Sequence, residues 1–191
     1  MKRLLVLVLV VAGASLSLSA QGARGWTTLF DGKNLDAFNK VGDANWTIAE
    51  DVVQANKGMG GYLVTKQSYG DFEIKAEFWV DTPANSGVFI RCANAQMPGA
   101  EACYEVNIFD TRPDPTYGTG AIVNVAKVAM PIKAGGKWNT YEIRAQGSHL
   151  EVTLNGVKTV DVQDMKHARG PIGLQYGAGV VKFRNVQVRS L

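Results

Sequence analysis

The sequence predicts an all-β domain folded as a two-sheet antiparallel sandwich, or jelly roll, and three observations support this. Apolar and polar side chains alternate along many short segments, as expected for strands whose two faces have different surroundings. The 21 glycines and frequent turn signals separate these segments. Few stretches show the 3.6-residue period of an amphipathic helix. Ten or more antiparallel strands close best as two stacked sheets.

The first predicted strands are short, and a long one follows them. Residues 46–48 and 52–55 flank a turn at Glu50-Asp51, and residues 62–64 follow Gly60-Gly61. Residues 71–80 form the clearest strand, because polar side chains alternate there with a set that should face the core: Phe72, Ile74, Ala76 and Phe78.

Two strands in the middle of the chain, 85–91 and 104–110, carry polar side chains at positions that strict alternation sends away from the core. The apolar sets should point between the sheets: Val88 and Ile90 on the first strand, and Tyr104, Val106 and Ile108 on the second. The other sets should share the concave outer face of one sheet: Gly87, Phe89, Arg91, Glu105 and Asn107. An Arg, a Glu and an amide beside a Gly and a Phe indicate a polar ligand site.

Further strands follow to the end of the chain. Residues 122–128 are a candidate strand, and residues 138–145 place Trp138 and Thr140 opposite Tyr141 and Ile143. Asn155-Gly156 joins residues 150–154 and 157–161 and is the strongest short signal for a hairpin. Residues 171–175 and 180–188 complete the sheets. The Pro-containing segment 111–120 is a long loop that could border a site or serve as a plain connector.

The first 22 residues are predicted to be a signal peptide, followed by a single domain over residues 23–191. Lys2 and Arg3 precede the apolar run 4–11, and small polar residues follow it. We therefore expect an exported protein, periplasmic or secreted, with no membrane attachment once the signal is removed. Losing Lys2 and Arg3 lowers the formal net charge from +3 to +1, and no cluster of Lys and Arg suggests a nucleic-acid partner. A neutral partner such as a carbohydrate fits this balance better.

The only two cysteines are Cys92, at the end of one strand, and Cys103, at the start of the next. In an exported protein they are expected to form a disulfide that closes the loop between them, which would contribute about 3 kcal/mol. Strict alternation would send the two side chains to opposite faces of the sheet. The bridge therefore requires Cys103 to lie in the loop before the regular strand. Two thiols without nearby His ligands do not make a zinc site, and no metal site is predicted.

The order of motifs along residues 26–191 resembles the 3-keto-disaccharide hydrolase domain family, once known only as a domain of unknown function. Eight segments carry the resemblance, in this order: 26–35 (WTTLFDGKNL), 69–73 (YGDFE), 85–91 (NSGVFIR), 104–110 (YEVNIFD), 137–139 (KWN), 154–156 (LNG), 173–175 (GLQ) and 183–186 (FRNV). The resemblance implies the fold of the concanavalin A-like lectins and glucanases. It also implies hydrolysis of glycosides that are already oxidised to a ketone at sugar carbon 3.

The ketone acidifies the C2 proton, so a base can form an enolate that expels the aglycone from C1 before water adds back. Such a site needs a carboxylate, a cation or donor near the ketone oxygen, and an aromatic wall. We predict Glu105 as the base, Arg91 as the group that stabilises the enolate, and Asp110 as a second acid/base or as the partner that orients Arg91. The predicted substrate-binding residues are Asn85, Phe89, Asn107, Tyr117, Trp138, Gln175 and Tyr176.

Alternatives stand beside these roles. Arg91 and Glu105 could form a structural cross-strand pair, Asp110 could cap a turn, and Trp138 could belong to the core or its rim. His149 and His167 lack partners at a catalytic spacing. The Glu-x-Asp-x-Glu motif of retaining glucanases is absent, because Glu105 and Asp110 fall on opposite faces of their strand. No cofactor is predicted, and a divalent cation is left open.

The alternative function is a non-catalytic carbohydrate-binding or scaffold module. The resembled family commonly has Gln at the position of Asn107, and often His where this chain has Tyr176-Gly177.

Overall fold

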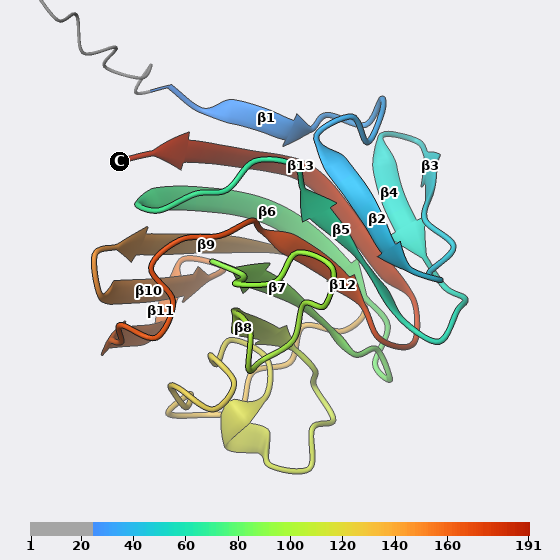
Figure 1. Cartoon of the computed structure of the whole chain (residues 1–191). Coiled ribbons are helices and arrows are strands. Elements are labelled where there is room, and N and C mark those ends of the chain that lie inside the picture. Colours follow the sequence, from blue (N-terminus) through green and yellow to red (C-terminus); the bar gives the residue numbers. More distant parts are fainter. Residues whose placement is uncertain (1–24) are drawn as a thin grey trace, which may run out of the picture.

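The computed structural model describes residues 25–191, and in them two antiparallel sheets pack face to face (Figure 1). The predicted signal peptide, residues 1–22, lies outside the described residues. The eight-stranded sheet has the order β11-β10-β9-β6-β13-β4-β3, with β1 added beside β13. Its strands are β1 (Thr27–Phe30), β3 (Thr47–Ala49), β4 (Val52–Ala55), β6 (Phe72–Val80), β9 (Trp138–Gln146), β10 (His149–Leu154), β11 (Val157–Gln163) and β13 (Val181–Ser190).

The five-stranded sheet has the order β2-β5-β12-β7-β8. Its strands are β2 (Phe38–Gly42), β5 (Gly61–Thr65), β7 (Ser86–Ile90), β8 (Tyr104–Ile108) and β12 (Gly173–Tyr176). The predicted all-β sandwich is therefore confirmed. No helix among residues 25–191 is long and apolar enough to span a membrane.

The core lies between the sheets and is built from the apolar positions that alternation assigned to it. Phe72, Ile74, Ala76 and Phe78 of β6 are all buried in it, and their polar neighbours point to the other side of the sheet. The inward sets of β7 and β8 belong to the same cluster, as predicted: Val88, Ile90, Tyr104, Val106 and Ile108.

Two predicted turns are confirmed by the backbone. Asn155 and Gly156 have φ values of +51° and +80°, and they join β10 to β11 as the two-residue hairpin requires. Glu50 and Asp51 also have positive φ, +51° and +60°, and they join β3 to β4. A turn with both central residues at positive φ matches the right-handed twist of the flanking strands.

The structure corrects one predicted strand and adds two. Residues 122–128 are not a strand, because the chain reverses at Asn124, with φ +61°, so that Ile122 bridges Val106 on one side and Ala126 on the other. Strands β1 and β2 were not predicted. Their burial does not alternate, since β1 changes from exposed to buried halfway and β2 is largely exposed.

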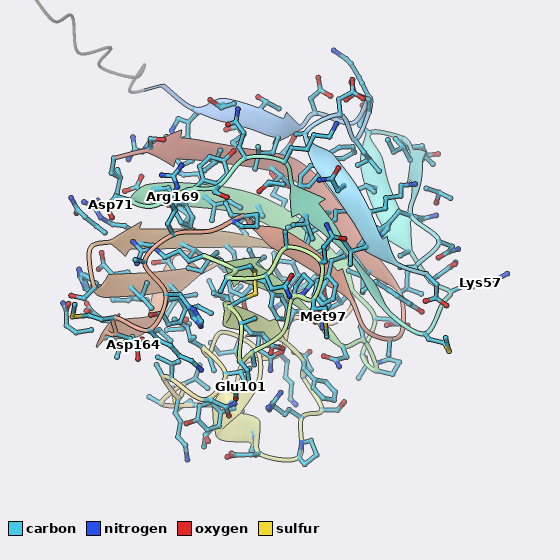
Figure 2. All side chains as sticks on the ribbon, viewed as in Figure 1. Lys57, Asp71, Met97, Glu101, Asp164 and Arg169 are labelled. Carbon is cyan, nitrogen blue, oxygen red and sulfur yellow. A yellow bond between two sulfur atoms is a disulfide. The ribbon has the colours of Figure 1, made fainter. Side chains whose placement is uncertain are left out.

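The predicted disulfide between Cys92 and Cys103 is present, with the two Cα atoms 4.1 Å apart, and its sulfur atoms lie beside β7 (Figure 2). Cys103 precedes β8, so the alternation of side chains along that strand does not determine its direction. The bridge closes a loop at the end of the five-stranded sheet.

Candidate functional site

The candidate site lies on the outer face of the five-stranded sheet, the side turned away from the core. Strand register places Tyr62, Gln175, Gly87 and Asn107 in one row across β5, β12, β7 and β8. The next row contains Gly173, Phe89 and Glu105. We call this set the outer-face site, and its members are Tyr62, Gly87, Phe89, Glu105, Asn107, Gly173 and Gln175.

Gly87 forms the floor of the outer-face site. A Cβ added there would stand 3.1 Å from Phe89 Cε2 and from the Val106 carbonyl oxygen, and 3.5 Å from Glu105 Cγ. Because Gly87 has no side chain, the Phe89 ring can lie close to the backbone there, in the row between Gln175 and Asn107. The glycine therefore sets the position of Phe89 beside Glu105.

We expect Gly87→Ala to reduce ligand binding and to cost about 1–3 kcal/mol of stability, as overpacking usually does. The added methyl group would occupy the floor and press on Phe89. Thermal melting and the KM for substrate would report the two effects. Gly99→Ala is the matched control, because Gly99 lies outside the site and a Cβ there would meet nothing within 4 Å. Equal KM values in Gly87→Ala and wild type would contradict this role of Gly87.

Glu105 is the carboxylate of the outer-face site, and its environment is unusual for a charged group. Only 9% of the residue is exposed. Burial raises the pKa of its carboxyl group above the ordinary value, while the positive charge of Arg112 acts in the opposite direction. Within residues 25–191 no hydrogen bond stabilises the ionised form. A buried carboxylate without a partner costs stability, which is typical of groups retained for chemistry.

Two amide side chains flank the floor of the site, and each has a buried oxygen without a partner among the described residues. Asn107 is fully buried, and its Nδ2 donates to the Tyr117 carbonyl oxygen at 2.7 Å, which leaves Oδ1 unpaired. Gln175 donates from Nε2 to the Tyr62 hydroxyl at 3.2 Å, and its Oε1 is unpaired. Buried acceptors are normally satisfied, so these two oxygens are free to accept hydrogen bonds from a ligand or from bound water.

Aromatic rings form one wall of the site. The ring of Tyr62 meets that of Phe89 edge to face, with centroids 5.2 Å apart. Phe89 packs in turn against the disulfide of Cys92 and Cys103. The bridge therefore supports this wall, and sequence reasoning predicted Phe89 as part of the site but missed Tyr62. An outward-facing tyrosine next to the inward Leu63 was the signal available for it.

Arg91 is not on this face, and its predicted role beside Glu105 is wrong. Its φ is +51°, which breaks the alternation of β7 and turns the side chain toward the eight-stranded sheet. The buried guanidinium donates to the carbonyl oxygens of Gly70, Gly147 and His167 at 2.9, 2.7 and 3.3 Å. It also contacts Asp71, labelled in Figure 2, at 3.2 Å. Arg91 thus ties separate loops to the end of β7.

Asp110 holds a loop together and does not contact Arg91. Its Oδ1 accepts from the Thr119 hydroxyl at 2.6 Å, and its Oδ2 accepts from the backbone amides of Ala134 and Gly135, both at 2.8 Å. With both oxygens engaged, the carboxylate has the turn-capping role that was the alternative for it. The role predicted for Asp110 in acid/base chemistry is corrected accordingly.

Two predicted substrate-binding residues also lie elsewhere. Trp138 is on the outer face of the eight-stranded sheet, across the sandwich from Glu105, where the Arg184 guanidinium lies 4.0 Å from its ring centre. Tyr176 faces the core, because it follows the outward Gln175 and adjacent strand residues point to opposite faces.

Asn85 and Tyr117 lie at the border of the site. The backbone of Asn85 pairs with Gly177 and Ala178, just beyond the end of β12. Tyr117 belongs to a 3₁₀ helix, Pro115–Tyr117, and its carbonyl oxygen holds Asn107. These contacts are made by the backbones of both residues. That their side chains contact the substrate stays a prediction.

One group of potential metal ligands occurs among the described residues, on the β10–β11 hairpin of the other sheet. His149, Glu151 and Asp161 offer ligand atoms that all lie within 4.8 Å of one another. Lys158 donates to Glu151 and Asp161 at 2.7 and 2.6 Å and so brings a positive charge to these carboxylates. Nothing connects this group to Glu105. His167 belongs to the loop network around Arg91.

The architecture is that of the lectin-like β-sandwich proteins, and several solved structures are similar to it. A candidate glycosyl hydrolase from Parabacteroides distasonis superposes with a TM-score of 0.71 at 28% identity, over 87% of this chain and all of that one. A second from the same organism gives 0.77 at 20% identity, over 88% and 95% of the two chains. The carbohydrate-binding module CBM66 from Bacillus subtilis gives 0.63 at 17% identity, over 87% and 96%. No curated protein matches the sequence.

Residues 25–189 match the model of the 3-keto-alpha-glucoside-1,2-lyase-like domain, and the chain belongs to this family. The resemblance inferred from the motifs is therefore confirmed, together with the lectin-like fold that it implies.

Proposed function

We propose that this protein is an exported enzyme that cleaves 3-keto-glycosides or 3-keto-disaccharides, with Glu105 as the base. Glu105 removes the C2 proton, the resulting enolate expels the aglycone from C1, and water then adds to C1. Family membership supports the substrate class. The single observation that carries the assignment of the base is the buried carboxylate of Glu105 without a hydrogen-bond partner on a sheet face with two unsatisfied amide oxygens.

The surroundings of Glu105 suit proton abstraction from carbon. A base works best when its pKa is near the working pH, and burial raises the pKa of this carboxyl group in that direction. The positive charge of Arg112 acts against this rise in pKa and favours the ionised form of the base. The unpaired oxygens of Asn107 and Gln175 are acceptors for the hydroxyl groups of a sugar.

Incubating the purified domain with a 3-keto-glucoside and with the unoxidised glucoside tests the proposal. We expect release of the aglycone from the oxidised substrate alone, since only the ketone makes the C2 proton acidic. The assay is run with and without a chelator, which addresses the open question of a divalent cation. A protein that cleaves neither compound, or the unoxidised one equally well, would rule out this function.

The pH dependence offers a further test. Since the base must be deprotonated, activity should rise with pH through an apparent pKa above the ordinary Glu value. Replacing Arg112 with Gln removes the positive charge that lowers the pKa of Glu105, so this acidic limb should move to higher pH. The pH profile of kcat/KM measures the shift. A limb that stays in place, or moves to lower pH, would show that Glu105 does not control the reaction.

A non-catalytic carbohydrate-binding module is the second candidate, because unsatisfied amide oxygens and an aromatic wall would serve binding equally well. Saturable binding of an unoxidised glycan, without turnover of any keto-sugar, would favour it.

A further inference from the structure

Tyr62 enters the outer-face site from β5 and reaches across the neighbouring strand. Gly173 lies between Tyr62 and Phe89, and a Cβ there would stand 3.6 Å from Tyr62 Cδ1 and 3.5 Å from Phe89 Cβ. The Tyr62 ring lies beside Gly173 of β12 and meets the Phe89 ring edge to face. Phe89 is directly paired with Glu105 on β8, so Phe89 of β7 lies between Tyr62 and Glu105 on this face of the sheet.

The hydroxyl of Tyr62 has a proton to give. Its oxygen accepts a hydrogen bond from Gln175 Nε2 at 3.2 Å, and it makes no other hydrogen bond with residues 25–191. The Gln175 contact fixes the position of the oxygen without using its hydrogen. The O–H bond is therefore available to a ligand on the same face as Glu105.

The charge state of Tyr62 fits a proton donor. Burial raises its pKa, the hydrogen bond from Gln175 acts in the opposite direction, and the negative charge of Glu105 raises it again. The phenol is thus protonated at neutral pH and able to give its proton to a basic oxygen.

We infer that Tyr62 is the second catalytic residue of the site and donates its proton to the glycosidic oxygen as the bond to C1 breaks. This inference rests on the proposed function and assigns to Tyr62 the role of acid that was predicted for Asp110. Two groups on one face, a base and an acid, match a substrate whose reacting atoms C2 and the glycosidic oxygen are both attached to C1.

The two residues complete a balanced cycle. Glu105 takes the C2 proton, the electron pair of that C–H bond becomes the C1=C2 double bond through the enolate, and the C1–O bond breaks. The departing oxygen takes the Tyr62 proton and leaves as an alcohol. Water then adds to C1 and gives a proton to the Tyr62 phenolate, while protonated Glu105 returns a proton to C2. Both side chains end in their starting states.

The test compares two 3-keto-glucosides, one with a sugar or alkyl alcohol as the aglycone and one with nitrophenol. Tyr62→Phe keeps the ring contact with Phe89 and removes only the hydroxyl. We expect kcat/KM to fall roughly 100-fold or more for the alkyl substrate, the usual loss when general acid catalysis is removed. For the nitrophenyl substrate, whose leaving group needs no proton, kcat/KM should fall less than about tenfold. Equal losses on both substrates, or no loss on the first, would overturn the inference.

A second measurement separates this role from the proposed function. The keto-sugar 1,5-anhydro-3-ketoglucitol has no leaving group, so deuterium exchange at C2 reports Glu105 alone. Tyr62→Phe should retain this exchange, whereas Glu105→Gln should lose it. Loss of exchange in Tyr62→Phe would mean that the hydroxyl acts on the enolate instead and would overturn the inference. A wild-type protein that neither exchanges nor cleaves would overturn the proposed function as well.

The matched control is Tyr69→Phe, which removes the hydroxyl of a tyrosine buried in the core beside Phe72. This variant should leave the ratio of kcat/KM for the alkyl substrate to kcat/KM for the nitrophenyl substrate unchanged. Thermal melting of both variants shows whether a loss of activity follows from unfolding.

Discussion

Replacing Glu105 with Gln is expected to lower kcat on a 3-keto-glucoside at least about 100-fold, within the range that general base catalysis contributes. The amide keeps the shape of the side chain but cannot accept the C2 proton. Glu142→Gln is the matched control, since Glu142 is half exposed on the other sheet and pairs only with Lys75. Activity of Glu105→Gln within a few-fold of wild type would place the base elsewhere.

The same variant is expected to keep or slightly raise the Tm at neutral pH. The folded-state pKa of Glu105 lies above its unfolded value, so the native state binds more protons in between. Stability is therefore lost as pH rises through this window, and ionised Glu105 is a cost above it. Gln removes that cost, so the variant should be more stable than wild type only at higher pH. This difference in stability should disappear in acid, below the pKa of Glu105 in the unfolded state. A large drop in Tm would instead indicate a structural role for the carboxylate.

Arg91→Ala is expected to have the opposite signature, a loss of about 3–5 kcal/mol of stability, as when a buried charged contact is broken. In a domain of this size that corresponds to a fall in Tm of roughly 6–20 °C. The substitution leaves the carbonyl oxygens of Gly70, Gly147 and His167 without their donor and releases Asp71. Chemical denaturation followed by tryptophan fluorescence measures the loss.

Arg144→Ala is the control for this experiment, because Arg144 is a partly exposed arginine that pairs with Glu73 at the surface. Surface pairs contribute about 1 kcal/mol or less. If Arg91→Ala retained wild-type stability but lost activity, the site would have to be redrawn around Arg91.

The alternation of side chains predicted most of the fold and part of the site. It assigned Val88 and Val106 to the core and Phe89, Glu105 and Asn107 to the opposite face, and the register of β7 and β8 confirms this. It failed at Arg91 because a single residue with positive φ inverts the direction of its side chain. Positive φ is uncommon in arginine, so the sequence does not predict it there.

The alternation of side chains along a strand also does not predict which of the two sheets the strand belongs to. Trp138 was predicted to point opposite to Tyr141 and Ile143, and it does, yet its strand belongs to the eight-stranded sheet, so the residue lies on the far side of the sandwich from Glu105. Tyr176 could have been excluded from the sequence, since Gln175 and its neighbour on the same strand cannot face one side. Alternation next to the inward Leu63 could have placed Tyr62 on the outer face, but its place in the row of Gln175 follows only from the register of β5 and β12.

The position of β13 has a consequence for how the domain comes to be folded. Val181–Ser190 inserts between β6 and β4 and also pairs with β1, so three strands from the first half of the chain pair with this last segment, and β1 pairs with no other strand among the described residues. Such long-range pairing is slow to form. While the ribosome is still making residues 181–190, β4 and β6 have open edges, and the nascent chain cannot complete its larger sheet. Completion of the larger sheet, and with it of the core between the sheets, therefore waits until synthesis has passed β13.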